Sequence, residues 1–249
     1  MLTQLIINAD DFGYSPAINY GIIEAFKKGV VTSTTLMVNM PGAAHAAALA
    51  LENKELGVGI HLVLTCGKPI SQLVPTLIKS DGSFTTFDQI IENGSVSEIE
   101  EEFKKQMETF VSYGLRPTHI DSHHHVHAHN LIYPIVEKLA IRWGLPIRKI
   151  TKNKGFANQL DMVDYFDHTF YGDNLNNQVL IDSINKITSF ETAEIMCHPG
   201  FLDEAVCLGS SYNIQRIKEW SILTSPEIKM AIEQKKIVLS TYNIFNRRK

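Results

Sequence analysis

Residues 5–16 read Leu-Ile-Ile-Asn-Ala-Asp-Asp-Phe-Gly-Tyr-Ser-Pro, a stretch that predicts a buried strand, a polar turn and the start of a helix. The apolar residues at its beginning are typical of a short buried strand. Ser15 and Pro16 supply an N-cap and a proline in the first helical turn, and apolar residues at helical spacing continue as far as Gly29. The chain therefore opens with one strand–helix unit of an α/β protein.

The same alternation of strand and helix signals continues along the chain. Further strands are predicted around residues 31–38, 56–64, 119–121, 147–150, 194–197 and 236–239. Further helices are predicted over residues 41–52, 131–143 and 175–188. Two more are predicted from their starts, one at a capping box of Ser97 and Glu100 and one at a cap of Ser225 and Pro226. Residues 66–95 are rich in turn signals, and we expect them to be largely irregular.

Repeated units of this kind predict an α/β fold with a mainly parallel sheet. A chain of 249 residues is long enough for a single (β/α) barrel of the TIM-barrel type, complete or incomplete, and we expect one domain over residues 1–249. An open doubly wound sheet is the alternative.

The composition excludes several classes of function. A formal net charge of −4 and a pI near 6.2 argue against nucleic acid or an anionic membrane as the main partner. No apolar run approaches the ~20 residues of a membrane span, and residues 1–11 lack the pattern of an export signal. Cys66, Cys197 and Cys207 are odd in number and widely separated, so we expect reduced thiols and a cytoplasmic protein.

A histidine-rich tract lies in the middle of the chain. Residues 119–129 read His-Ile-Asp-Ser-His-His-His-Val-His-Ala-His, with five of the ten histidines at positions 123–129. Carboxylate and imidazole groups are a common mixed ligand set for a catalytic metal ion. If the tract is extended, one face carries Asp121, His123, His125 and His127. A solvated polar loop is the alternative.

Polar groups also follow other predicted strands at comparable positions. The catalytic groups of (β/α) barrels gather at the carboxyl ends of the strands, so we expect one shared site. Each group alone has an ordinary structural explanation, such as a turn, a core histidine or the end of a strand. The candidates are Asp10 and Asp11 after the first strand, His61 in the third, Asp121 and His123 at the fourth, and His198 after a late strand.

Two adjacent carboxylates near several imidazoles suit metal-assisted hydrolysis. One aspartate and two histidines can hold a divalent ion and leave positions open for water and substrate. The second aspartate can accept a proton from the water, and a further histidine can protonate the leaving amine. The sequence carries no signature of a nucleophilic serine, a Walker loop or a dinucleotide-binding loop.

Five blocks of the sequence resemble the YdjC-like carbohydrate deacetylases, a family that includes the bacterial chitooligosaccharide deacetylases. The resemblance runs from the first strand to residue 225 and is weak over 70–100 and 151–190. The blocks are residues 8–13, 31–35, 59–65, 117–127 and 196–201.

The resemblance implies a distorted (β/α) barrel and a defined reaction. The reaction is removal of the acetyl group from an N-acetylglucosamine unit of chitobiose or a short chitooligosaccharide, with or without a 6-phosphate. The resemblance also implies one divalent metal ion held by Asp11, His61 and His123, and it assigns magnesium. A ligand set this rich in imidazole fits zinc, cobalt or nickel better.

The family pattern also assigns roles to the remaining candidates. Asp10 matches the general base, and His198, by a weaker match, the general acid. We expect contacts to substrate, or support of the metal ligands, from Asp121, His125 and His127. A homodimer is the expected assembly.

Two other functions remain open at this stage. A metal-dependent phosphoesterase or another amidohydrolase could use the same barrel, because a fold alone does not fix the chemistry. A metal-buffering or sugar-binding protein without turnover is the other possibility. The pair Asp10 and Asp11 argues against buffering, since a metal store needs no free base beside the ion.

Overall fold

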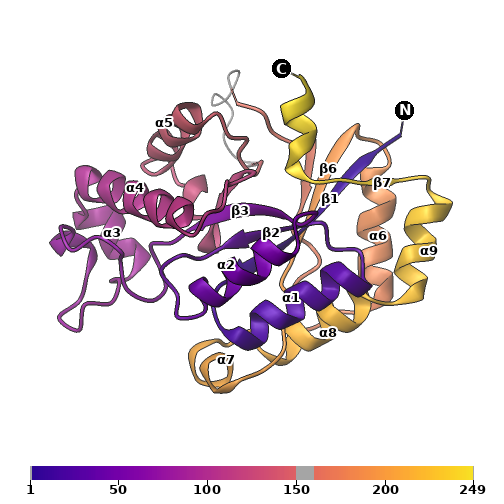
Figure 1. Ribbon diagram of the computed structural model, residues 1–249, viewed down its shortest axis with the longest axis horizontal. Helices are drawn as coiled ribbons and strands as arrows, with labels where there is room; N and C mark the ends of the chain where they lie inside the picture. Colours follow the sequence, from indigo (N-terminus) through magenta and orange to yellow (C-terminus); the bar gives the residue numbers. More distant parts are fainter. Residues whose placement is uncertain (1, 150–159, 249) are drawn as a thin grey trace.

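The computed structural model describes residues 2–149 and 160–248, and its strands form one sheet (Figure 1). The strand order is β4-β3-β2-β1-β6-β5, and β7 also pairs with β1. All of these pairings are parallel. The strands are β1 (Gln4–Phe12), β2 (Ser33–Leu36), β3 (Gly57–Leu62), β4 (Ile120–Ser122), β5 (Tyr165–Asp167), β6 (Thr192–Cys197) and β7 (Val238–Leu239).

The strand order makes the sheet an open, distorted barrel. Strands β1 to β4 lie side by side in chain order. The chain then forms β5 at the other edge of the sheet and returns to β6, which lies between β5 and β1. In a doubly wound sheet the first strand of the second half would lie next to β1 and the later strands farther out. The observed order is the reverse, so that alternative is wrong. Within residues 2–149 and 160–248 no pairing joins β4 to β5, and the ring is open there. The predicted α/β barrel with mainly parallel strands is confirmed.

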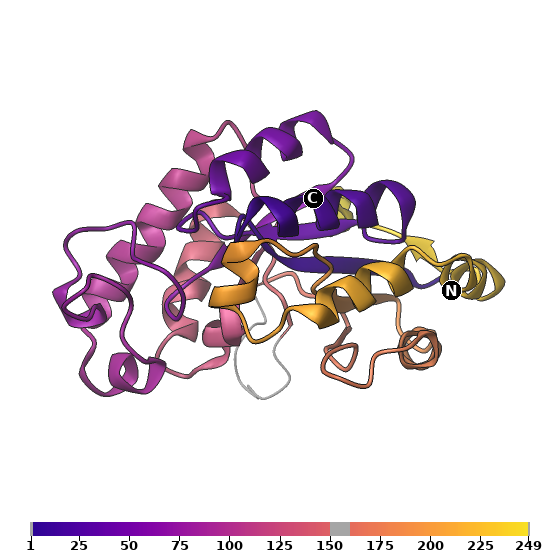
Figure 2. The same cartoon turned by 90° about the horizontal axis from the view of Figure 1, so that it is seen from below.

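Helices surround the sheet (Figure 1). Helix α1 packs against α2 and α8, α4 against α5, and α6 against α9. Figure 2 shows α1 and α2 side by side from below. The α-helices are α1 (Pro16–Lys28), α2 (Ala43–Glu52), α3 (Phe87–Asn93), α4 (Val96–Ser112), α5 (Tyr133–Trp143), α6 (Asn177–Ile187), α7 (Glu204–Gly209), α8 (Ile214–Leu223) and α9 (Pro226–Gln234). The 3₁₀ segments are η1 (Pro75–Leu77), η2 (His123–Ala128) and η3 (Tyr242–Arg248).

Two of the three predicted helix starts are confirmed. The hydroxyl of Ser15 accepts a hydrogen bond from a backbone N–H of α1, and Ser225 does the same for α9. The capping box at Ser97 is wrong, because α4 begins at Val96 with Ser95 as its N-cap. The hydroxyl of Ser97 instead lies 2.8 Å from that of Ser95.

Several short elements were not predicted. Strand β5 and helices α3 and α7 are too short to show a clear hydrophobic period, whereas α8 has apolar residues at helical spacing and was missed. The strand predicted over 147–150 is reduced to one bridge between Ile147 and Ile120, and Ile150 lies outside the described residues.

The central strands are buried over most of their length. In β1 only Gln4 is partly accessible, and β2, β3 and β6 are buried throughout. Polar side chains at the ends of these strands must therefore find partners inside the protein or in a cavity. Among the described residues, no helix combines the length and the apolar character that crossing a membrane requires.

Candidate active site

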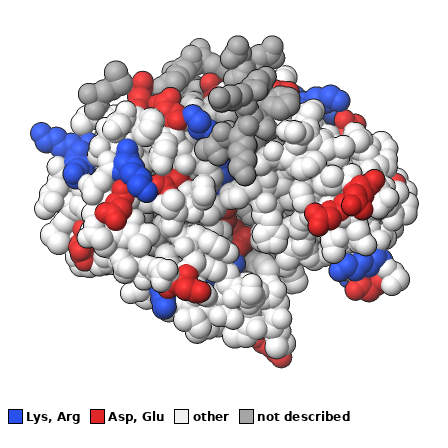
Figure 3. All heavy atoms as spheres, turned by 180° about the vertical axis from the view of Figure 1, so that it is seen from behind, with Lys and Arg blue, Asp and Glu red and all other residues white. Residues whose placement is uncertain are grey.

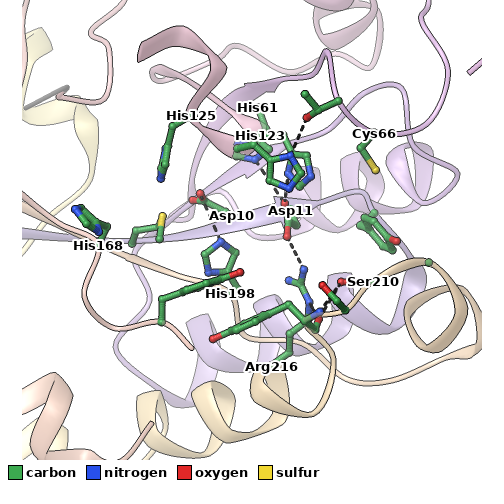
Figure 4. A pocket seen from close by; sticks show the side chains of 18 residues that line it. Asp10, Asp11, His61, Cys66, His123, His125, His168, His198, Ser210 and Arg216 are labelled. Atoms are coloured by element: carbon green, nitrogen blue, oxygen red, sulfur yellow. Dashed lines mark hydrogen bonds and ion pairs between the residues drawn. The ribbon is translucent and has the colours of Figure 1, made fainter. Parts of the chain in front are cut away.

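A cavity of about 600 Å³ lies where β1, β3 and β6 end and where the chain leaves β4. Its lining includes both aspartates of β1 together with His61, His123 and His198 (Figure 4). Parallel strands end at the same edge of a sheet, which explains how residues far apart in sequence meet here. The structure thus brings together the five residues predicted to bind metal or transfer protons.

The surface on the side shown in Figure 3 carries interspersed acidic and basic side chains. No single-sign patch stands out on this face.

The backbone at the end of β1 turns sharply at Asp11. Its φ of 68° lies in the left-handed region, which is rare for a residue with a side chain. Gly13 follows with φ 94°, and a Cβ there would lie 2.8 Å from the carbonyl oxygen of Met37. This turn directs Asp10 and Asp11 to different partners, although they are consecutive.

Asp11 lies among two imidazoles and a guanidinium. Its Oδ1 atom is 3.1 Å from His123 Nδ1 and 3.5 Å from His61 Nε2. One ligand atom of each of these three residues lies within 4.8 Å of the others, so the group could hold a metal ion. Asp11 Oδ2 accepts a hydrogen bond of 2.6 Å from Arg216 Nη2. Although burial raises the pKa of Asp11, Arg216 and His123 hold it well below its usual range.

His61 is oriented by the residues behind it. Its Nδ1 atom lies 2.6 Å from Asp121 Oδ1 and 3.1 Å from the Thr35 hydroxyl. A carboxylate that fixes one ring nitrogen leaves the other available as a ligand. His61 Nε2 therefore faces Asp11.

Asp10 is held by Arg148, with which it makes two hydrogen bonds. Arg148 Nη1 donates to Oδ2 at 2.7 Å, and Nη2 donates to Oδ1 at 2.6 Å. Asn8 adds a third hydrogen bond of 2.9 Å to Oδ1. Burial raises the pKa of Asp10, but Arg148 outweighs it and holds the pKa far below its usual value. Asp10 is therefore ionised at neutral pH.

Arg148 also binds two other buried carboxylates. Its guanidinium lies 2.9 Å from Asp121 Oδ2 and 2.8 Å from Glu194 Oε1. Glu194 in turn accepts a hydrogen bond of 2.5 Å from the Tyr242 hydroxyl. Arg148 thus holds Asp10 directly and also contacts Asp121, the carboxylate that orients His61.

His198 lies next to Asp10, on the side away from His61 and His123 (Figure 4). Its Nε2 atom is 4.0 Å from Asp10 Oδ2. The backbone N–H of His198 donates to Glu219, whose Oε1 lies 3.9 Å from the Nδ1 atom. Burial lowers the pKa of His198 to about 4, so its imidazole is neutral at pH 7. A neutral imidazole must receive a proton before it can act as an acid.

The histidine tract is not an extended strand. Residues 123–128 form η2, and His124 and His125 each have φ 52°. The prediction of one extended face is therefore wrong beyond Ser122. A tight turn instead places His123, His124 and His125 in the lining of the cavity.

Asp121 and His127 lie behind the cavity wall. Asp121 is fully buried and contacts Arg148 in addition to Thr35 and His61. His127 is also buried, with Nδ1 2.5 Å from the hydroxyl of Ser122. Neither side chain is in the lining of the cavity, so only His125 of the three predicted substrate contacts is placed to touch a substrate.

Sequence reasoning missed Arg148 and Arg216. Neither belongs to a recognisable motif, and each meets its aspartate across more than a hundred residues of chain. One signal was available, because two buried carboxylates in a row require compensating positive charge. That signal does not say which of the chain's cations supply it.

The sequence matches a known protein family over most of its length. The family model described as YdjC-like protein matches residues 4–234. The chain belongs to the YdjC-like family. The resemblance carried by the five sequence blocks is thereby confirmed, and the family match also spans residues 70–100 and 151–190, where the resemblance is weak.

Relatives that match this chain over nearly its whole length are named as deacetylases. A carbohydrate deacetylase of Geobacillus stearothermophilus is 48% identical over 240 residues, 96% of this chain and 97% of the relative. A chitooligosaccharide deacetylase of Serratia marcescens is 43% identical, over 96% of this chain and 97% of its own length.

A solved crystal structure has the same fold. It comes from Enterococcus faecalis, and its name proposes a cellobiose-phosphate cleavage protein. It matches with a TM-score of 0.94 and 36% identity, covering 98% of this chain and 99% of the other. The open barrel is therefore shared over nearly the whole length of both chains.

Proposed function

We propose that this protein is a metal-dependent N-deacetylase of short chitin-derived sugars. It removes the acetyl group from an N-acetylglucosamine unit of chitobiose or a short chitooligosaccharide and releases acetate. The observation that carries the proposal is the division of partners between two adjacent aspartates. Asp11 faces two imidazoles, whereas Asp10 faces an arginine and His198.

The residues around Asp11 fit a divalent cation. One carboxylate oxygen and two imidazole nitrogens form a compact donor set, and Asp121 fixes the ring of His61. When bound, the cation would polarise the amide carbonyl, stabilise negative charge on its oxygen and make water more acidic. Magnesium follows from the family pattern, while the two imidazoles favour zinc, cobalt or nickel.

A second group of potential ligands is a poorer choice. Asp10, His61 and Asp121 also lie close together, and all three are buried. The guanidinium of Arg148 already lies within hydrogen-bond distance of both carboxylates. A cation there would have to displace or repel a fully buried arginine, which is strongly unfavourable.

Asp10 accepts the proton of the attacking water in this proposal. A carboxylate held by an arginine is a weak base, so the proton does not remain on Asp10. His198 is neutral at rest, and its Nε2 atom lies 4.0 Å from Asp10 Oδ2, so it can receive the proton once its ring moves closer or through one bridging water. His198 then protonates the nitrogen as the C–N bond breaks, and the products are acetate and the free amine of the sugar.

The cavity suits a small sugar. Ligand sites typically enclose about 300–1,000 Å³, and the cavity here measures about 600 Å³. His125 in its lining is placed to contact substrate hydroxyls. Asp121 and His127 act indirectly, by holding His61 and Ser122 in place.

One assay tests the function and separates it from its alternatives. Acetate release is measured from N,N′-diacetylchitobiose and from its 6-phosphate, with magnesium, zinc, cobalt or nickel added after chelation. We expect acetate release that is lost on chelation and restored by at least one ion. Phosphate release without acetate would support a phosphoesterase instead. Sugar binding without turnover under every metal condition would support a binding protein.

Two further properties belong to this proposal. Cys66, Cys197 and Cys207 are all free thiols, which suits a cytoplasmic location. We also propose a homodimer, which light scattering of the purified protein would test.

A further inference from the structure

Two tyrosines form a stacked pair in the wall of the cavity. The ring centroids of Tyr171 and Tyr212 are 4.3 Å apart, and their planes differ by 9°. Both rings belong to the lining of the cavity. They differ in exposure, because Tyr212 is 9% exposed whereas Tyr171, at 52%, is open to solvent.

The inner ring of this pair is fixed in place. The hydroxyl of Tyr212 donates a hydrogen bond of 2.5 Å to Glu219 Oε1 and accepts one of 3.2 Å from the backbone of Gly172. Gly172 is the residue next to Tyr171, so the same bond also holds the backbone that carries the outer ring. A preorganised aromatic surface loses little entropy when a ligand packs on it.

The stacked pair lies next to the proposed catalytic groups. The ring of His198 meets Tyr171 edge-on at 5.2 Å and Tyr212 at 5.6 Å. His198 is in turn 4.0 Å from Asp10. The imidazole of His198 is therefore in contact with both tyrosines on one side and close to the Asp10 carboxylate on the other.

A large exposed aromatic ring at a cavity needs an explanation. Apolar C–H groups cover the faces of a pyranose ring, and aromatic faces attract the positive edges of C–H bonds. If the N-acetyl group of a substrate reached Asp10 and Asp11, its own sugar ring would lie near His198, which is 4.0 Å from Asp10. The adjoining sugar unit would then reach Tyr171.

We propose that Tyr171, stacked on Tyr212, binds the sugar unit next to the one that loses its acetyl group. The proposal rests on the proposed deacetylase function and adds a disaccharide-recognition residue to it. Tyr171 thereby makes the protein prefer an oligosaccharide over a single N-acetylglucosamine.

The kinetic test compares substrates of one and two sugar units. Steady-state acetate release from N-acetylglucosamine and from N,N′-diacetylchitobiose is measured for Tyr171→Ala and Tyr171→Phe. Tyr20→Ala is the matched control, because Tyr20 is 51% exposed on α1 and is not in the cavity lining. We expect Tyr171→Ala to raise KM for the disaccharide by roughly 3- to 10-fold, with little change in kcat. Values for the monosaccharide, and for the other two variants, should stay near those of the parent protein.

A binding measurement separates this inference from the function on which it rests. Calorimetric titration with N,N′-diacetylchitobiose is done in an Asp10→Asn background, where turnover does not interfere. Weaker binding with Tyr171→Ala but not Tyr20→Ala supports the stacking role even if the parent protein releases no acetate, and in that case only the deacetylase function fails. Normal acetate release with unchanged KM and binding in Tyr171→Ala overturns the stacking role alone. Equal losses on the one-unit and two-unit substrates also overturn it, because they indicate a general structural effect.

Discussion

Asp10 and Asp11 are neighbours in one strand, and each binds a buried arginine, but the two pairs are built differently. Arg148 contacts three buried carboxylates and occupies both oxygens of Asp10. Arg216 contacts Asp11 through Nη2 alone, and its Nη1 has no hydrogen-bond partner among the described residues. Asp11 therefore keeps one oxygen directed at His61 and His123.

This difference in partners suits two chemically identical side chains to the different roles that we propose for them. A carboxylate with one oxygen directed at imidazoles can join them as a ligand. A carboxylate whose two oxygens are both held by a guanidinium is less available to a cation, but it is a rigid proton acceptor. The left-handed backbone at Asp11 makes the division possible, because it turns adjacent side chains toward different partners.

The largest expected effect comes from removing a metal ligand. Asp11→Ala, His61→Ala and His123→Ala should each lose bound metal and activity together, because each removes one of the three proposed protein ligands. Metal analysis of the purified variants, alongside acetate release, checks this. His45→Ala is the control, since His45 lies outside the cavity lining and should keep both properties. A full metal content in any of the three would remove that residue from the ligand set.

The next prediction compares the two arginines directly. Arg148→Met leaves three buried carboxylates without their shared cation and should cost roughly 3–5 kcal/mol of unfolding free energy. Arg216→Met removes one hydrogen bond to Asp11 and one to the backbone carbonyl oxygen of Tyr212, and it should cost about 1–3 kcal/mol. Urea denaturation measures both, and the exposed Arg142→Met serves as control, with a change within about 0.5 kcal/mol. Equal losses of unfolding free energy at Arg148 and Arg216 would contradict the proposed difference between the two arginine–aspartate pairs.

A smaller effect is expected at Asp121, which contacts His61 on the side away from the proposed metal site. Asp121→Asn weakens the hold on His61 Nδ1 and should reduce metal affinity by roughly 10–100-fold. Titration with the activating metal, followed by acetate release, gives the apparent affinity. His61 should still bind at high metal concentration, so saturating metal should restore much of the rate. Unchanged affinity would mean that Asp121 serves Arg148 and not His61.

The sequence allowed prediction of what depends on local pattern. The first strand–helix unit follows from its apolar run and from Ser15, and the parallel barrel follows from repetition of such units. Strand-end placement predicted one shared site for six residues. Asp10, Asp11, His61, His123 and His198 do line one cavity, whereas Asp121 is buried behind its wall.

What could not be predicted depends on distant contacts and on unusual backbone angles. Alternation assumes an extended chain, and the left-handed residues His124 and His125 break that assumption. Arg148 and Arg216 carry no local signal, because their partners lie in β1. Ser97 matched a capping pattern, yet the N-cap is Ser95, two residues earlier, and the helix begins at Val96.

The most direct test of the division between the aspartates is to replace each by asparagine and measure metal content and turnover together. Asp10→Asn keeps the shape but removes the proton acceptor, so metal should remain bound while turnover falls by ~10²–10⁴-fold. Asp11→Asn replaces an anionic ligand with a neutral one, so metal affinity should fall first and added metal should recover part of the rate. Loss of metal in Asp10→Asn with retention in Asp11→Asn would reverse the assignment, and near-normal turnover in both would contradict the account.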